Sequence, residues 1–476
     1  MQVAVSILAI SLITAAAGCG SGSGTTPTPN PTPAANTAVQ VNMGDSPADW
    51  MLAFSMNITS MSLTSSTGST PVVSSSTPME MMHLMGTMQP LAMVSAPQGT
   101  YTGASITIGS ATVMYMDPTT KAPVQKTISG PITGTVTFGS AVNVGSTPMA
   151  MGFDLDLAKS VGQDSSGNFT MTPVFNVSSG MQGSGNPMNF ENGGVQQMMG
   201  TVTGATGSSF TMTSMQASQT FTFGMNSSTT FAGTSMGSMA SGMLTIVDAE
   251  MQPDGSLMAT NVQNMMGSGG VMGGGMVTAM VTAVTGQPPS SLALTMVMQN
   301  GAGSSMMASY FASGATISMT SGTTYSMDQD QIDMTGLPFT PAFDASHIYV
   351  GQSVMPVSSG GMMSGGGMGG GGMMGGAGMA GTINATQLYL EPQGLTGTVA
   401  TAISGGAAAT VPLTLPSDSA FTTLTGATSV TIYQQAKTTV TNGTSIPSGT
   451  SVHAFGLLFF DGGQWKMVAE RIGSNS

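Results

Sequence analysis

Apolar residues recur at every second position along this chain, as in the runs 39–43, 54–58 and 61–63. A spacing of two places such side chains on one face of a β-strand, with the alternate residues on the other face. Thr, Ser, Gly and Val dominate over the usual helix formers, and Met outnumbers Leu. This mixture favours strands and turns. We therefore predict an all-β chain.

Charged residues make up only 5% of the chain, whereas soluble domains usually carry about 25%. Lys and Arg total 6, Asp and Glu 19, and His 3, which gives a net charge of −13. There is no basic patch of the kind that binds nucleic acid, and the usual general bases and nucleophiles are scarce. The composition predicts a protein that is not an enzyme and does not bind nucleic acid.

The first residues predict the compartment. An apolar stretch, 3–18, ends in Ala15-Ala16-Ala17-Gly18 and is followed at once by Cys19, the only cysteine. The stretch has the length of a signal peptide, and its junction with Cys19 resembles a bacterial lipobox, in which the thiol is lipidated. The residues after Cys19 lack an acidic retention signal, which for such lipoproteins implies the outer membrane. An ordinary secretion signal that leaves Cys19 as a free thiol is the alternative.

The region after the tether carries the motifs of a small domain. The turn Asp45-x-Pro47-Ala48, the segment Pro97-x-Gly99-Thr100-Tyr101, the pair Phe153-Asp154 and the later Pro173 follow one another in this order. They resemble a family of domains of unknown function found in bacterial envelope lipoproteins. The resemblance implies a small β-sandwich and no reaction.

Four aspartates of this region invite a reading as paired carboxylates. Asp45 and Asp49 flank Pro47, where an Asp side chain commonly caps a turn, so we interpret them as turn residues. Asp154 and Asp156 lie two apart and therefore share one strand face, which we expect to be solvated.

One pattern then appears three times. A Val-rich strand begins near 200, 276 and 397, and a Thr-Thr pair precedes an apolar residue. A glycine then leads into another strand, and a last strand carries an Ala. The landmarks are Thr229-Thr230, Thr323-Thr324 and Thr438-Thr439, then Gly242, Gly351 and Gly449. Such repetition predicts three related β-units. The first copy contains the run SSFTM from Ser208, the pair Asp254-Gly255 and the run LMATNV from Leu257. With these residues it resembles an uncharacterised bacterial family of small, possibly OB-like β-barrels, and we interpret the units as scaffold because two of them contain no Lys or Arg.

These observations predict the following organisation: a signal peptide over 1–18, a disordered tether over 19–37, a β-sandwich over 38–180, a linker over 181–198, and barrel units over 199–265, 266–392 and 393–476, the second with a Gly/Met-rich insertion. The Gly/Met-rich loops are expected to be disordered, since Gly-rich chain buries little.

Methionine is unusually frequent, with 48 residues. Many of them alternate within strands and are expected to fill the core. Others lie in Gly-rich segments where we expect exposure, and soft thioethers prefer Cu(I). The candidate metal ligands are Met79, Met81, Met82, His83, Met85, Met362, Met363, Met368, Met373 and Met374. Cu(I) or Ag(I) binding, sacrificial oxidation and low-complexity drift are the alternatives for these residues, and no other cofactor is predicted.

Three further signals are weak. Gly233–Gly237 matches the Gly-x-Ser-x-Gly of hydrolases but lacks the strand–helix context that the motif needs. Asp328, Asp330 and Asp333 lack the glycine hinge and final Glu of a calcium loop. The histidines His83, His347 and His453 fall in different predicted units.

Together the sequence predicts a non-enzymatic envelope lipoprotein, a structural or adhesion-like module. Its expected partners are the membrane, through the lipid on Cys19, and a polysaccharide or an envelope protein. Capture of Cu(I) or Ag(I), or scavenging of oxidants, by the Met-rich segments is the alternative function.

Overall fold

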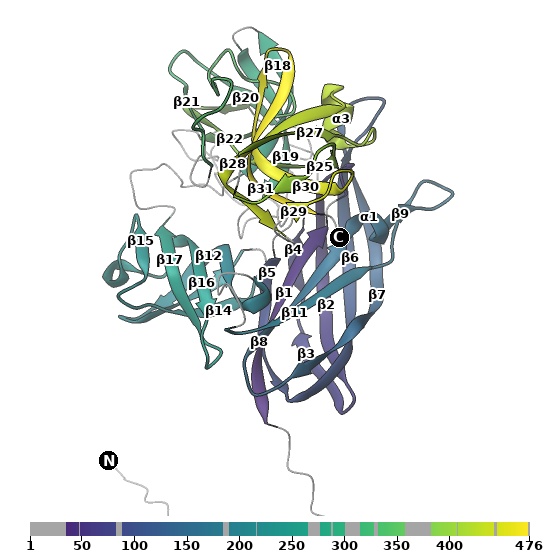
Figure 1. Cartoon of the computed structure of the whole chain (residues 1–476), viewed down its shortest axis with the longest axis vertical. Coiled ribbons are helices and arrows are strands. Elements are labelled where there is room, and N and C mark those ends of the chain that lie inside the picture. The colour runs from purple at the N-terminus through teal and green to yellow at the C-terminus, as the bar shows by residue number, and fades with distance from the viewer. Residues whose placement is uncertain are drawn as a thin grey trace, which may run out of the picture. The chain divides into compact units, whose positions relative to one another are not determined.

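Strands account for most of the residues that the computed structural model describes (Figure 1). The chain divides into Met1–Ala34 and Ala35–Ser476, and every described residue belongs to the second part. The described residues are 35–46, 48–81, 88–183, 190–215, 217–264, 277–286, 289–299, 315–327, 332–357, 382–406, 408–441 and 445–474. The predicted all-β class, with several small domains, is confirmed.

Two sheets form the first domain. One has the order β11-β8-β1-β5, and the other has the order β3-β2-β6-β7 with β4 paired to β2. Figure 1 shows β2, β6 and β7 as long neighbouring strands. Their bounds are β1 Asn36–Ser46, β2 Met51–Ser65, β3 Gly68–Val73, β4 Thr77–Glu80, β5 Met88–Pro97, β6 Gly99–Met116, β7 Pro123–Val144, β8 Met149–Asp156 and β11 Phe175–Met181.

The two sheets share one hydrophobic core, as a β-sandwich requires. Val39, Val41 and Met43 of β1 and Phe153 of β8 are fully buried and belong to the same cluster as Ile58 of β2. The alternation read from the sequence therefore gives each strand its inward face.

The Pro-x-Gly-x-Tyr motif has a structural role in this domain. Tyr101 is 1% exposed, and its hydroxyl donates to the carbonyl of Pro97 at 2.9 Å and lies 3.1 Å from the hydroxyl of Thr70. The polar end of the ring is satisfied while its body fills the core. The motif thus fixes the start of β6.

A short corner closes the sandwich. The helix α1, Leu157–Ser160, follows β8 directly and leads into the hairpin of β9, Val161–Gln163, and β10, Phe169–Met171. The carboxylate of Asp156 accepts from the backbone N–H of Lys159 at 2.9 Å and caps the helix.

The linker expected over 181–198 is partly structured. It contains the 3₁₀ helix η1, Phe190–Asn192, and the start of β12, Val195–Ala205. The Gly and Asn content of this segment had indicated a loop. The strand β12 nevertheless begins within it, because Val195 and Met198 are fully buried there.

The first barrel unit contains β12, β13 Ser209–Ser214, β14 Thr220–Gly224, β15 Thr230–Ala232, η2 Met236–Ser238, β16 Leu244–Met251 and β17 Leu257–Asn264. β12 pairs with β13 and β16, β13 pairs with β14, and β16 pairs with β17. The parallel pairing of β14 with β17 closes the circuit. Around the barrel the strands follow the order β12-β13-β14-β17-β16, and β15 pairs with β17 outside this circuit.

The third unit repeats this order in a closed barrel, β25-β27-β28-β31-β30, again with a parallel pair, β28 with β31. Its bounds are β25 Gln393–Val399, β26 Ile403–Ser404, β27 Ala409–Thr414, α3 Ala420–Thr425, β28 Ser429–Thr441, β29 Ser445–Ile446, β30 Ser451–Asp461 and β31 Gln464–Ser474.

The second unit has the same pairings with its last strand divided in two. The sheet order is β21-β24-β22-β18-β19-β20-β23. β23 is the last strand of this order and β24 the second, yet the two follow one another in the chain, so together they correspond to the last strand of the other units. The bounds are β18 Val277–Gly286, β19 Pro289–Gln299, β20 Ala315–Ser318, β21 Thr324–Met327, β22 Ser353–Val357, β23 Thr382–Asn384 and β24 Gln387–Leu390.

The repeated Thr landmark has the same geometry in all three units. The hydroxyls of Thr229, Thr323 and Thr438 donate to the carbonyls of Ala259, Ala385 and Ala469 at 2.8, 2.8 and 2.6 Å. Each hydroxyl also accepts from a backbone N–H three residues earlier, at 3.0, 3.0 and 2.8 Å. We call this arrangement the threonine clamp. In the first two units it ties the residue before β15 or β21 to β17 or to the break between β23 and β24, and in the third unit it ties Thr438, within β28, to the last strand.

The repeated glycines are equally alike. Gly242, Gly351 and Gly449 have φ values of +90°, +102° and +80°, which favour glycine. Their N–H groups donate to the carbonyls of Val202, Val281 and Val399 at 2.8 Å in each case. The units therefore repeat in atomic detail as well as in pattern.

Candidate functional site

The structure places two of the candidate metal ligands in the core. Met79 is 2% exposed and pairs with Met56 across β4 and β2, while Met81 is fully buried and donates its N–H to the carbonyl of Phe54 at 2.8 Å. The expectation that these two thioethers are exposed is wrong, because β4 continues the alternation of its neighbour and turns them inward.

The remaining candidates, Met82, His83, Met85, Met362, Met363, Met368, Met373 and Met374, lie outside the described residues, as does Cys19. Within the described ranges, no group of three His, Cys, Asp or Glu side chains could hold a metal ion. In the same ranges, no helix is both long and apolar enough to cross a bilayer. Cu(I) binding by the Met-rich segments stays a prediction.

The Gly-x-Ser-x-Gly match is a helix cap. The hydroxyl of Ser235 lies 2.8 Å from that of Ser238, and the two residues form a capping box at η2. Asp333 similarly accepts from the N–H and hydroxyl of Thr335, at 3.0 and 2.7 Å, in a local turn. Asp328 and Asp330 lie outside the described residues. Local hydrogen bonding accounts for both described residues.

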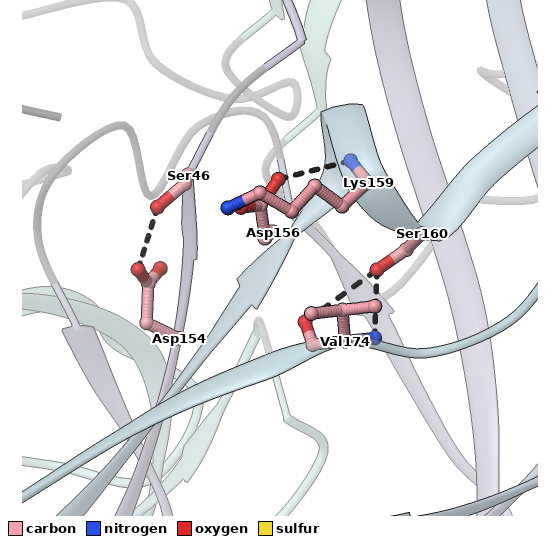
Figure 2. Close-up of polar contacts among 6 residues, drawn as sticks. All are labelled: Ser46, Asp154, Asp156, Lys159, Ser160 and Val174. Carbon is pink, nitrogen blue, oxygen red and sulfur yellow. Dashed lines mark hydrogen bonds and ion pairs between the residues drawn. The ribbon is translucent and has the colours of Figure 1, made fainter. Parts of the chain in front are cut away.

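Asp154 and Asp156 lie at the end of the parallel pair β1–β8, close to α1 (Figure 2). Ser46 donates to Asp154 at 2.6 Å, and burial raises the pKa of Asp154 in spite of this bond and one from Asn176. Asp156 is 8% exposed and forms an ion pair with Lys159 at 2.6 Å. The expectation of a solvated face is wrong, because the corner at α1 covers it.

Ser160 completes this corner. Figure 2 shows its hydroxyl between the backbone groups of Val174, whose N–H donates to it at 2.9 Å. The polar groups of the corner thus have protein partners, and the arrangement holds α1 and the segment before β11 in place.

Two titratable groups meet at the hydroxyl of Thr396. Nδ1 of His453 lies 3.0 Å from it, and burial together with the charge of Arg471 lowers the pKa of this histidine to about 3. Asp49 also forms a hydrogen bond with Thr396, yet burial and the charge of Asp418 raise its pKa to about 6. A histidine held neutral this strongly is a poor general base near pH 7.

The other described histidine, His347, lies in a turn where its Nδ1 is 2.8 Å from a carboxylate oxygen of Asp344. Asp45, interpreted from the sequence as a turn residue, lies instead within β1 and is 2% exposed. His347 thus has a partner three residues away in its own turn, whereas the partner of His453, Thr396, lies on the paired strand β25.

A different surface of the sandwich is open. The outer face of sheet β3-β2-β6-β7 carries Ser and Thr in rows that the register defines: Ser62–Ser105–Thr135, Ser60–Thr107–Thr133 and Thr64–Gly103–Thr137. We call this surface the hydroxyl face. It consists of Ser60, Ser62, Thr64, Ser105, Thr107, Thr133, Thr135 and Thr137.

The inward neighbours of these residues fix the face from below. Leu63, Ile106 and Val136 alternate with face residues on β2, β6 and β7, and they are 0%, 2% and 6% exposed. Side chains anchored in this way present the intervening hydroxyls outward at regular spacing. Along a strand the rows are about 6.8 Å apart, and neighbouring strands are about 4.8 Å apart.

Most hydroxyls of the face are exposed, and none of them bonds to another residue that the structure describes. Thr133, Thr135 and Thr137 on β7 are exposed, as is Ser105 on the central strand β6. The hydroxyls of Ser62, Ser105 and Thr135 make no hydrogen bond to another described residue. Each can both donate and accept. The surface can therefore exchange hydrogen bonds with a neutral polar ligand without first breaking any of its own.

Charge is absent from the face itself. The nearest bases along these strands are Lys121 and Lys126, at and just after the β6–β7 hairpin and beyond the rows that define the face. The sequence reasoning missed this surface, although the alternation in Ile132–Gly139, with Thr at every second position, carried the signal.

Comparison of the chain with family models, with curated proteins and with solved structures gave no match. The function must therefore be argued from the surface and the chemistry described above.

Proposed function

We propose that this chain is a non-enzymatic, lipid-anchored module of the bacterial cell envelope that binds a partner through the hydroxyl face. The observation that carries the proposal is the rows of uncharged hydroxyls that bond to no other described residue. Such a surface has the hydrogen-bonding capacity to bind a partner, and it contains no His, Asp, Glu or Lys side chain that could activate its hydroxyls as a general base near pH 7.

The anchoring part of the proposal rests on the sequence. Cys19 follows a signal-like apolar stretch, and the Gly/Ser and Thr/Pro tract after it would act as a flexible spacer from the bilayer. Multiply acylated cysteine anchors are effectively permanent. The three units, of which the first and third close into barrels and the second forms a seven-stranded sheet, have no Lys or Arg in the first two and would act as scaffold.

Two measurements test the proposal. Intact mass of the protein from the membrane fraction is expected to include acyl chains, and Cys19→Ser is expected to release the chain from that fraction. In the Cys19→Ser background, where no acyl anchor holds the chain, binding to isolated envelopes is expected to fall at least tenfold in Ser105→Glu/Thr135→Glu, since two carboxylates would disrupt a neutral face. Equal binding of the Cys19→Ser chains with and without these two substitutions would show that the face is not the binding surface.

A further inference from the structure

The hydroxyl face has the properties of a preorganised polar surface. Ser and Thr have few rotamers to lose, and the strands beneath them are held by the sandwich core through Leu63, Ile106 and Val136. A ligand that hydrogen-bonds to such a face pays little to order it.

We propose that the hydroxyl face binds a neutral polysaccharide, laid over the rows of β2, β6 and β7. This inference rests on the function proposed above and names its ligand. Sugar hydroxyls both donate and accept, as the Ser and Thr hydroxyls do, so each group on one surface finds a complementary group on the other.

Charge excludes the main competing polymers. The face has no Lys or Arg to pair with an anionic polysaccharide, and the chain as a whole carries a net charge of −13. The face also has no carboxylate to attract a polycation. An uncharged ligand loses nothing by the absence of ion pairs, whereas a charged polymer would lose hydration without compensation.

The affinity must come from many contacts together. The face has no aromatic residue for stacking on a sugar ring, because Tyr101 and Phe138 of the same strands point into the core at 1% and 7% exposure. Neutral hydrogen bonds are individually weak, so binding is expected to strengthen with the length of the polymer as more rows are engaged at once.

The test uses the full chain in affinity electrophoresis with two neutral polymers, a soluble glucan and a galactomannan. Polygalacturonate and chitosan serve as the anionic and cationic comparisons. The native chain is expected to be retarded by a neutral polymer, with a neutral hexasaccharide competing at least tenfold more weakly than the polymer on an equal mass basis.

The variant Ser62→Ala/Ser105→Ala/Thr135→Val removes the hydroxyls of one row and keeps the shape of the strands. It is expected to weaken binding at least tenfold. The matched control is Thr203→Val/Thr213→Val/Thr220→Val on β12, β13 and β14 of the first barrel, which is expected to bind as the native chain does. If the row variant is not folded by circular dichroism, the single substitution Thr135→Val on β7 replaces it, with a smaller loss expected.

Retardation by neutral polymers that the row variant retains would overturn the assignment of the face. Retardation only by polygalacturonate or chitosan, or by no polymer, would overturn the ligand class. In either of those last cases, loss of envelope retention in Ser105→Glu/Thr135→Glu would still support the proposed function, so the two failures are distinguishable.

Discussion

In the β-sandwich the hydroxyls of Ser62, Ser105 and Thr135 bond to no other described residue, whereas in each of the three repeated units a buried Thr hydroxyl bridges two distant backbone groups. The residue types are the same, and the difference lies in burial. An exposed hydroxyl exchanges one water partner for another, but a buried one must be bonded or the fold loses stability. Abundant Ser and Thr therefore serve two ends in one chain, a ligand-ready surface and an internal tie.

The outer surface of the first barrel is intermediate between these cases. There Thr203 donates to Thr211 at 3.0 Å, and the hydroxyls of Thr213 and Thr220 lie 3.2 Å apart. These threonines are partly satisfied by each other and have less capacity left for a ligand. This is why they make a suitable control for the hydroxyl face.

The largest expected effect is the opposite pH response of the two groups at Thr396. The pKa of His453 in the folded chain is about 3, below the 6.5 of the unfolded chain, so the unfolded state takes up the proton first. Stability from this group is lost as pH falls from about 6.5 towards 3, by about 4 kcal/mol. His453→Gln is expected to remove this loss.

Asp49 acts in the other direction. Its folded pKa of about 6 lies above the unfolded value of 3.8, so stability is lost as pH rises through this range, by about 2 kcal/mol after allowance for partial exposure. Asp49→Asn is expected to remove that loss and to leave the acid sensitivity of His453 unopposed. Urea denaturation of both variants and the native chain at pH 3.5, 5 and 7 measures this, and differences from the native chain that do not vary with pH would contradict it.

The next effect concerns the threonine clamp. Thr438→Val removes the group that bonds to the N–H of Gln435 and the carbonyl of Ala469, leaving two buried backbone groups unpaired. The free energy of unfolding is expected to fall by about 2 to 4 kcal/mol. Thr438→Ser keeps the hydroxyl and is expected to cost less than half as much in the same denaturation experiment.

Equivalent substitutions at Thr229 and Thr323 sharpen the comparison among the barrels. Both residues are 7% exposed, and both have the same pair of bonds as Thr438. We expect similar losses in the transitions of their own units. A loss confined to Thr438 would mean that the shared geometry is not a shared source of stability.

The smallest effect is expected on the hydroxyl face. Thr135→Val and Ser105→Ala remove exposed hydroxyls that bond to no described residue, and each is expected to change the free energy of unfolding by less than about 0.5 kcal/mol. A loss of more than 1 kcal/mol would indicate that these hydroxyls stabilise the sandwich, which would weaken the case for a binding surface.

The β-class and the repeats could be predicted because they depend on local patterns. Alternation of apolar residues indicates the strands, and the spacing of Thr, Gly and Ala indicates the repeats, from the sequence alone. Gly242 and Thr229 have positions that few other residues could occupy, one for its positive φ and the other for its buried hydroxyl. The structural role of such residues can therefore be predicted from the residue type and its position in the repeat.

The binding surface could not be predicted in the same way. Ser and Thr occur throughout the chain, and only the register between β2, β6 and β7 shows which of them form rows. The prediction that Met79 and Met81 are exposed was wrong for a related reason, since their burial follows from the pairing of β4 with β2. Strand partners that are distant in sequence decide both features.

The same clamp, glycine turn and strand pairing recur in three consecutive units. Duplication of one module, followed by divergence of the insertions in each copy, would produce such a recurrence. In the second unit the last strand is divided into β23 and β24, and the strand pairings are nevertheless kept. A chimera that exchanges the first and third units would have to keep Leu457, Phe459 and Val468 of the third unit, because these side chains pack into the core of the second unit.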